Sequence, residues 1–116
     1  MTRGGWGEVV AAQYLRRKGY QIVAQNFNTR FGEIDLIART GRFIVFVEVK
    51  TRKNDRFAAA REHVDGPKRR RIIATAEQWL QRNPTELQPR FDVVEIYGEE
   101  DLPVREIHHI ENAFDG

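Results

Sequence analysis

Two strand-like runs joined by a short turn restrict the fold of this chain more than any other feature. Residues 33–38 and 43–49 are rich in β-branched and aromatic residues, and Thr40-Gly41 lies between them. Runs of this composition on either side of a turn predict a β-hairpin. A turn with an even number of residues keeps a fixed set of side chains on each face, whereas an odd turn would exchange the faces.

The pairing within this hairpin predicts which side chains meet. If Thr40-Gly41 is the turn, Phe46 lies opposite Asp35, and Glu48 lies opposite Glu33. Opposed residues share a face, as do residues two apart on one strand. Asp35 and Glu48 are then diagonal neighbours, roughly 7–8 Å apart at the backbone. One face of the hairpin is therefore expected to carry Glu33, Asp35, Glu48 and Lys50.

Three carboxylates on one face repel each other and resist burial beside apolar neighbours. A hard divalent cation such as Mg²⁺ relieves both problems because it prefers carboxylate oxygens. In this interpretation Asp35 and Glu48 hold the metal, a bound water is activated, and Lys50 steadies phosphate charge. The alternative is a set of solvated ion pairs at strand ends, which is an ordinary surface feature.

The rest of the chain predicts an α/β domain with the order helix, three strands, helix, two strands. A mixed sheet flanked by helices fits this order. The whole of residues 1–116 is expected to form a single domain, with residues 52–66 as an exposed, mobile connection. The predicted helices are 5–18 and 66–83, the strands 20–24, 33–38, 43–49, 91–97 and 104–110, and residues 26–28 look like a turn.

The charge is distributed unevenly along the chain. Residues 1–71 hold sixteen Lys and Arg against seven Asp and Glu, whereas residues 72–116 hold three against ten. Such asymmetry suggests contact with nucleic acid or a membrane. There is no cysteine, which excludes disulfides and Cys-ligated zinc and fits a reducing cytoplasm. No apolar run is long enough to span a bilayer, and the first residues contain no apolar signal-peptide region.

Several ordered sequence blocks run through the chain from about residue 5 to residue 114. The blocks are Gly7-Glu8-x-x-Ala11-Ala12-x-Tyr14-Leu15, Gly19-Tyr20, Gly32-Glu33-Ile34-Asp35-Leu36-Ile37-Ala38, Val45-Phe46-Val47-Glu48-Val49-Lys50-Thr51-Arg52, Arg90-Phe91-Asp92-Val93-Val94 and His109-Ile110-x-Asn112-Ala113-Phe114. Together these blocks resemble the YraN family of small bacterial nuclease-like proteins.

The resemblance implies a restriction-endonuclease-like αβββαβ core, close to Holliday-junction resolvases, and metal-dependent cleavage of a phosphodiester. Carried over by position, Asp35, Glu48 and Lys50 form the catalytic signature. Glu8 corresponds to the additional acid of the resolvase-like branch and, like Glu33, is a further candidate metal ligand. Ile34 stands where the superfamily motif has proline.

Basic residues around the acidic group are the candidate nucleic-acid contacts, because phosphate binding by Lys and Arg gives salt-dependent, sequence-independent affinity. Lys68 is expected to approach the site, while Arg70 and Arg71 are expected on a solvated helix face. The three histidines show no ligand spacing. Asp92 either neighbours the site or pairs with an arginine. The candidate contacts are Arg30, Arg52, Lys53, Arg56, Lys68 and Arg69.

Taken together, the sequence predicts a cytoplasmic endonuclease that uses Mg²⁺ or Mn²⁺. Its expected partner is nucleic acid, DNA rather than RNA, with structured or branched DNA favoured and no membrane contact; a homodimer is left open. The alternatives are a non-catalytic nucleic-acid-binding module with the same fold and an RNA-processing factor. Loss of cleavage with retained binding in Glu48→Gln separates the first of these from the enzyme.

Overall fold

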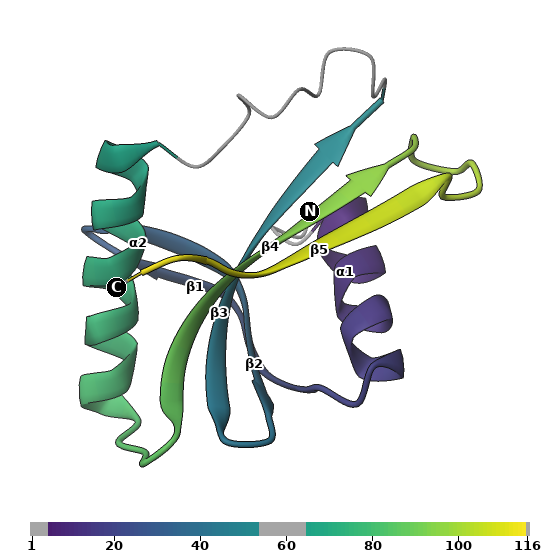
Figure 1. The fold of residues 1–116 in the computed structure, drawn as a ribbon. Helices are drawn as coiled ribbons and strands as arrows, with labels where there is room; N and C mark the ends of the chain where they lie inside the picture. The colour runs from purple at the N-terminus through teal and green to yellow at the C-terminus, as the bar shows by residue number, and fades with distance from the viewer. Residues whose placement is uncertain (1–4, 54–64, 116) are drawn as a thin grey trace.

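A computed structural model describes residues 5–53 and 65–115 of the chain. These residues form two helices and five strands in the expected order (Figure 1). The helices are α1 (Trp6–Arg17) and α2 (Gly66–Arg82), and the strands are β1 (Gln21–Thr29), β2 (Gly32–Thr40), β3 (Phe43–Arg52), β4 (Gln88–Tyr97) and β5 (Glu106–Phe114).

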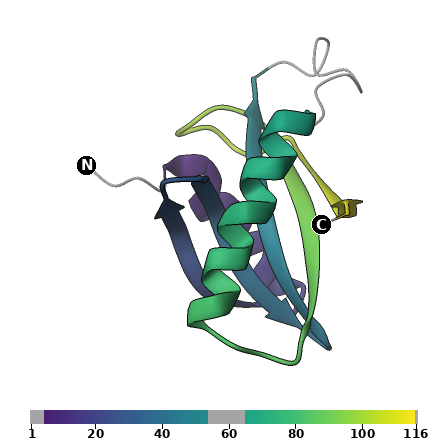
Figure 2. The ribbon, with the colours of Figure 1, turned by 90° about the vertical axis from the view of Figure 1, so that its left-hand side faces the viewer.

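The strands form one mixed sheet in which spatial order follows sequence order, β1-β2-β3-β4-β5. The β3–β4 pair is parallel, because α2 carries the chain back across the sheet, and the other pairs are antiparallel. One helix covers each face, with α1 and α2 on opposite sides in Figure 1 and α2 lying across the strands in Figure 2. The predicted mixed sheet flanked by helices is confirmed.

Side chains alternate between two hydrophobic clusters, one on each face of the sheet. On β3, Val45 and Val47 pack toward Leu15 of α1, whereas Phe46 packs toward α2. Helix α2 begins at a strong start signal, since the Asp65 carboxylate accepts a 2.9 Å hydrogen bond from the Lys68 backbone N–H. Both helices are thus fixed to the sheet by an apolar stripe.

The predicted register of the central hairpin is wrong by two residues. Thr40 pairs with Phe43, so the turn is Gly41-Arg42 rather than Thr40-Gly41. Gly41 has a φ of 52°, which glycine adopts without steric cost. Because both turns contain two residues, the shift leaves every side chain on its expected face.

Other boundaries also differ from the sequence prediction, since β4 begins at residue 88 rather than 91 and β5 runs over 106–114 rather than 104–110. Residues 26–28, expected as a turn, lie inside β1, although Asn26 has a φ of 51°. Most of the expected connection over residues 52–66 lies outside the described residues, but Arg52 still belongs to β3. The final strand is an edge strand, as expected. Neither helix of the described ranges has the length and apolar character needed to cross a bilayer.

Candidate metal and nucleic-acid site

Glu33, Asp35 and Glu48 lie in a small pocket between the β2–β3 pair and the start of α2. The pocket has a volume of about 210 Å³. Carboxylates of the two strands form one wall, and basic side chains of the helix form the other. Its lining residues are Gly32, Glu33, Asp35, Glu48, Lys68, Arg71 and Ile72.

The end of the β2–β3 ladder creates this pocket. The last paired residues are Leu36 and Val47, and continuing the register by one residue places Asp35 across from Glu48. Beyond that point the Val49 backbone N–H donates a 2.8 Å hydrogen bond to Asp35 Oδ2 instead of to a strand carbonyl. One carboxylate therefore both satisfies the backbone where the strands part and contributes charge to the pocket.

The electrostatic environment of Asp35 opposes its ionisation. Asp35 is only 8% exposed. Burial, followed by the charge of Glu48, raises its pKa from 3.8 to about 7, although the Val49 N–H bond acts in the opposite direction. Glu8 and Glu33 add smaller repulsions of the same sign. Burial and the neighbouring carboxylates therefore both disfavour the charge on Asp35, and a cation bound beside it would favour the ionised form.

Lys68 supplies the closest compensating charge. Its Nζ lies 2.6 Å from Glu48 Oε2, and the two side chains are 39% and 11% exposed, respectively. The position agrees with the expectation that Lys68 approaches the acidic residues. Because Lys68 is the more exposed partner, its side chain can move toward another anion, but the nearly buried Glu48 carboxylate then needs another cation to neutralise it.

The donor set fits Mg²⁺ bound with the help of substrate. Asp35 and Glu48 offer hard oxygen donors from adjacent strands. Within residues 5–53 and 65–115, no group of three His, Cys, Asp or Glu side chains converges on a point suitable for a metal. Mg²⁺ sites in enzymes of phosphate chemistry commonly use one or two carboxylates and take the remaining ligands from water and phosphate. The residues present fit that mode of binding.

Two predicted catalytic residues, Lys50 and Glu8, lie outside the lining of the pocket, whereas the candidate metal ligand Glu33 lies within it. Lys50 shares a face of β3 with Glu48 but stands one step further along the strand, in register with Glu95 of β4. Glu8 lines a separate hollow on the α1 side together with Val49. Its negative charge contributes to the raised pKa of Asp35. Glu33 is an exposed member of the pocket itself.

The predicted nucleic-acid contacts are spread around this region. Arg30 is exposed in the β1–β2 turn, and Arg52 and Lys53 lie at and just after the end of β3. Arg69 is partly buried, with its guanidinium carbon 5.5 Å from the centre of the Phe114 ring. Arg56 lies outside the described residues. Binding of nucleic acid by each of these residues stays a prediction.

Arg71 is a pocket residue that the sequence analysis assigned to the solvated face of α2. It is exposed, yet it lines the same pocket as Asp35 and Glu48. The start of β2 packs against the helix at this point, since a Cβ at Gly32 would lie in ordinary contact, 3.5 Å, with Arg71 Cβ. Helical spacing alone gives no sign of this contact.

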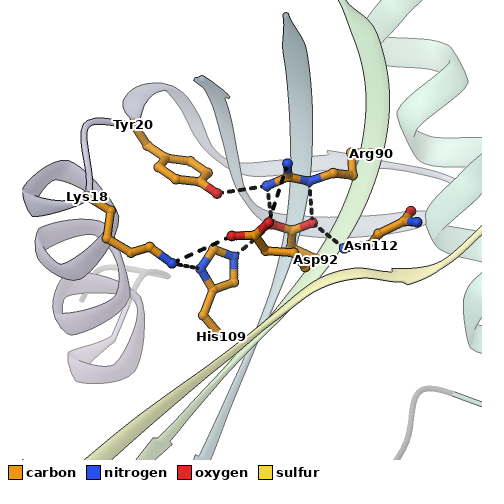
Figure 3. A network of polar contacts seen from close by, with 7 residues as sticks. Lys18, Tyr20, Arg90, Asp92, His109 and Asn112 are labelled. Carbon is orange, nitrogen blue, oxygen red and sulfur yellow. Dashed lines mark hydrogen bonds and ion pairs between the residues drawn. The ribbon is translucent and has the colours of Figure 1, made fainter. Parts of the chain in front are cut away.

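Asp92 belongs to a different polar cluster, on the α1 face of the sheet (Figure 3). Arg90 donates from Nε to Asp92 Oδ1 and from Nη2 to Asp92 Oδ2, at 2.9 Å each, and also contacts the Tyr20 hydroxyl at 2.7 Å. His109 Nε2 lies 2.7 Å from Asp92 Oδ2, and the Asn112 backbone N–H donates to Oδ1. The open question about Asp92 is thereby answered in favour of the arginine.

This cluster fixes the edge strand to the rest of the fold. Lys18 Nζ lies 2.8 Å from His109 Nδ1, and because an ammonium only donates, Nδ1 accepts and Nε2 carries the hydrogen shared with Asp92. Burial opposes the charge of Asp92, but the bonds from His109, Arg90 and Asn112 outweigh it and lower its pKa. The cluster therefore joins α1, β4 and β5 through one buried carboxylate.

His108 does not join this cluster. His108 is half exposed on β5, with its ring nitrogens 3.1 Å from Glu106 and 3.9 Å from Glu95. His63 lies outside the described residues. His108 and His109 therefore differ in exposure as neighbours on an edge strand do when they point to opposite faces.

Comparison with known proteins identifies the family. The family model described as "Uncharacterised protein family UPF0102" matches residues 7–96. A UPF0102 protein of Caldanaerobacter subterraneus subsp. tengcongensis is 46% identical over 115 residues, which are 97% of this chain and 94% of that protein. The chain belongs to the UPF0102 family. A UPF0102 protein of Mesorhizobium japonicum is 47% identical over 116 residues, covering 98% of this chain and 87% of the relative.

A UPF0102 protein of Vibrio parahaemolyticus is 46% identical over 112 residues, covering 95% of this chain and 89% of that protein. The segment that matches the UPF0102 family model includes all the residues of the acidic pocket. The names of these relatives state the family and no activity, so the chemistry of the UPF0102 pocket has to be argued from its residues.

Proposed function

We propose that this UPF0102 protein is a metal-dependent nuclease that hydrolyses phosphodiester bonds in DNA. The observation that carries the proposal is the buried Asp35 carboxylate, whose pKa is raised to about 7 beside Glu48. A fold does not need such a costly arrangement for its own stability, and perturbed carboxylates in a pocket are typical of functional sites. The resemblance to the YraN family and its restriction-endonuclease-like core supports the same conclusion.

In this proposal Asp35 and Glu48 hold a divalent cation against the substrate phosphate. Val49 keeps Asp35 oriented through its backbone N–H, which leaves Oδ1 of the carboxylate available to a ligand. When bound, Mg²⁺ or Mn²⁺ would supply Lewis-acid chemistry, polarising the phosphodiester and lowering the pKa of a water. Glu8 and Glu33 add negative charge that favours the cation without lying closest to it.

The basic wall of the pocket positions the phosphate. Lys68 exchanges its contact with Glu48 for a phosphate oxygen, and Arg71 binds a second oxygen from the same side. Lys50, next to the pocket on β3, steadies negative charge that develops during hydrolysis. Arg30 and Lys53 extend the positive surface on either side and hold the flanking strand by its phosphates.

The second candidate function is non-catalytic binding of nucleic acid with the same surface. The Lys68–Glu48 contact favours it, because a lysine on a carboxylate can also serve as a static structural ion pair. RNA as the substrate is a third candidate. The same cleavage experiment, run on DNA and RNA of identical sequence and shape, tests all three.

The decisive experiment compares wild type with Glu48→Gln on labelled junction, flap and duplex substrates in Mg²⁺, Mn²⁺ and EDTA. The proposal expects cleavage by wild type only with metal, no cleavage by Glu48→Gln, and nearly unchanged binding by that variant. Glu77→Gln is the matched control, because Glu77 is exposed on α2 outside the pocket lining. Binding without cleavage by wild type in both metals would refute the enzyme and support the binding module.

A further inference from the structure

A second hollow adjoins the acidic pocket on the outer side of α2. Its volume is about 300 Å³, and it lies between the β1–β2 turn and the first turns of the helix. One aromatic ring and two guanidinium groups border it. The lining residues are Phe31, Pro67, Arg70, Arg71 and Ala74.

The aromatic wall of this hollow is held in place by the turn that carries it. The Phe31 backbone N–H donates a 3.0 Å hydrogen bond to Thr29 Oγ1. The next residue, Gly32, packs against Arg71, and its backbone φ is 150°. A residue other than glycine would be strained at that φ, and the 3.5 Å separation between a Cβ there and Arg71 Cβ places the turn directly beside α2.

The chemistry of the hollow suits a nucleobase with its phosphates. The half-buried Phe31 ring has the Arg30 guanidinium carbon 5.1 Å from its centre, so a positive charge already lies against the ring. Arg70 and Arg71 are exposed, and neither forms an ion pair with a carboxylate in the part of the chain that the structure describes. An aromatic platform beside unneutralised arginines is the usual basis for binding single-stranded nucleic acid.

The hollow is continuous with the proposed site through one residue. Arg71 lines both this hollow and the pocket that holds Asp35 and Glu48. A DNA strand whose phosphate enters the acidic pocket therefore presents a neighbouring nucleotide to Phe31. Arg71 lies between the two and can contact the phosphate that joins them.

We propose that this hollow binds an unpaired DNA base next to the phosphate held at the acidic pocket, with the base stacked on Phe31. A base inside a duplex is covered on both faces by its neighbours, so only a base at a strand end, flap, bulge or junction can stack on the ring. The inference rests on the proposed nuclease function and specifies its substrate as DNA with an unpaired nucleotide at the cut.

The experiment measures binding in EDTA, where cleavage does not interfere. A flap DNA is prepared with an abasic site moved one position at a time through the unpaired strand, and the dissociation constant is measured for wild type and for Phe31→Leu. At one position, the abasic site should weaken binding by wild type about tenfold. Phe31→Leu should bind intact DNA about tenfold more weakly than wild type. Its affinity should fall no further when the abasic site is at that position.

Three controls make the outcome decisive. Phe31→Trp keeps a stacking surface and should restore binding. Phe27→Leu makes the same change on β1, outside the hollow, where the ring faces Arg82, and should bind like wild type. Thermal midpoints report whether each variant is folded. The inference is wrong if the loss of affinity caused by Phe31→Leu and the loss caused by the abasic site multiply when the two are combined. It is also wrong if Phe31→Leu binds intact DNA as tightly as wild type does. Failure of wild type to cleave in Mg²⁺ would instead refute the nuclease and leave this binding result standing.

Discussion

Replacing Asp35 by asparagine should stabilise the metal-free protein at neutral pH. The pKa of Asp35 in the fold is about 7, against 3.8 for the ordinary side chain. Between these values the folded state keeps a proton that the unfolded state has lost, so stability falls as pH rises. Asparagine can still accept the Val49 N–H bond through its carbonyl oxygen, but it carries no charge at any pH.

The magnitude follows from the size of the shift. Each pH unit in this range costs about 1.4 kcal/mol of unfolding free energy in wild type relative to Asp35→Asn. The window from pH 5.5 to 7 avoids titration of ordinary carboxylates and should open a difference of about 2 kcal/mol. Above the folded pKa the difference should become constant, because both states of wild type are then ionised.

Urea denaturation in EDTA at half-unit pH steps measures this difference. Glu77→Gln, an exposed change on α2, serves as the control and should follow wild type at every pH. Adding Mg²⁺ at pH 8 should stabilise wild type and leave Asp35→Asn unchanged, because a ligand stabilises only the state that binds it. A difference between wild type and Asp35→Asn that stays flat from pH 5.5 to 7 would refute the reasoning.

Three further predictions concern the surroundings of the site. Asp92→Asn should lower the free energy of unfolding by about 3 kcal/mol in urea denaturation, because it removes the buried carboxylate that pairs with the partly buried Arg90 at 2.9 Å and leaves Arg90 with the more distant Glu111 at 3.8 Å; a loss below about 1 kcal/mol would contradict this. Gly32→Ala should cost about 2 kcal/mol in the same assay because φ is 150° there, and an unchanged midpoint would contradict it. Lys68→Met should tighten Mg²⁺ binding in calorimetry by removing the charge beside Glu48, while lowering the salt slope of DNA binding by about 1; weaker Mg²⁺ binding would contradict the arrangement.

The face on which the acidic residues lie could be predicted from sequence because it depends only on local alternation. Any two-residue turn between the two runs puts Asp35 and Glu48 on the same side of the sheet. The register itself could not be predicted, since an X-Gly pair is the common signal and this turn uses glycine in its first position. The resulting shift brings Asp35 directly across from Glu48 instead of diagonally.

The missed parts of the structure depend on contacts between distant segments. Asn26 interrupts the pattern of β1, yet the strand continues because it lies at the sheet edge, where polar residues face solvent. Arg71 becomes a pocket residue only because the β1–β2 turn packs against α2. Asp92 finds Arg90 two residues away but needs His109 from another strand to complete its bonds. Neither the hydrophobic periodicity nor any sequence motif indicates these contacts between distant segments.

The order of the strands has a consequence for how the molecule folds. Short turns join β1, β2 and β3, so this meander can form from local contacts, whereas β4 pairs with β3 only after α2 has crossed the sheet. We therefore expect the acidic side chains of β2 and β3 to meet before the helix brings Lys68 to them. We expect substitution of Lys68 to speed unfolding and leave the refolding rate nearly unchanged, which stopped-flow kinetics would measure. Equal changes in both rates would show that the helix docks while the meander is still forming.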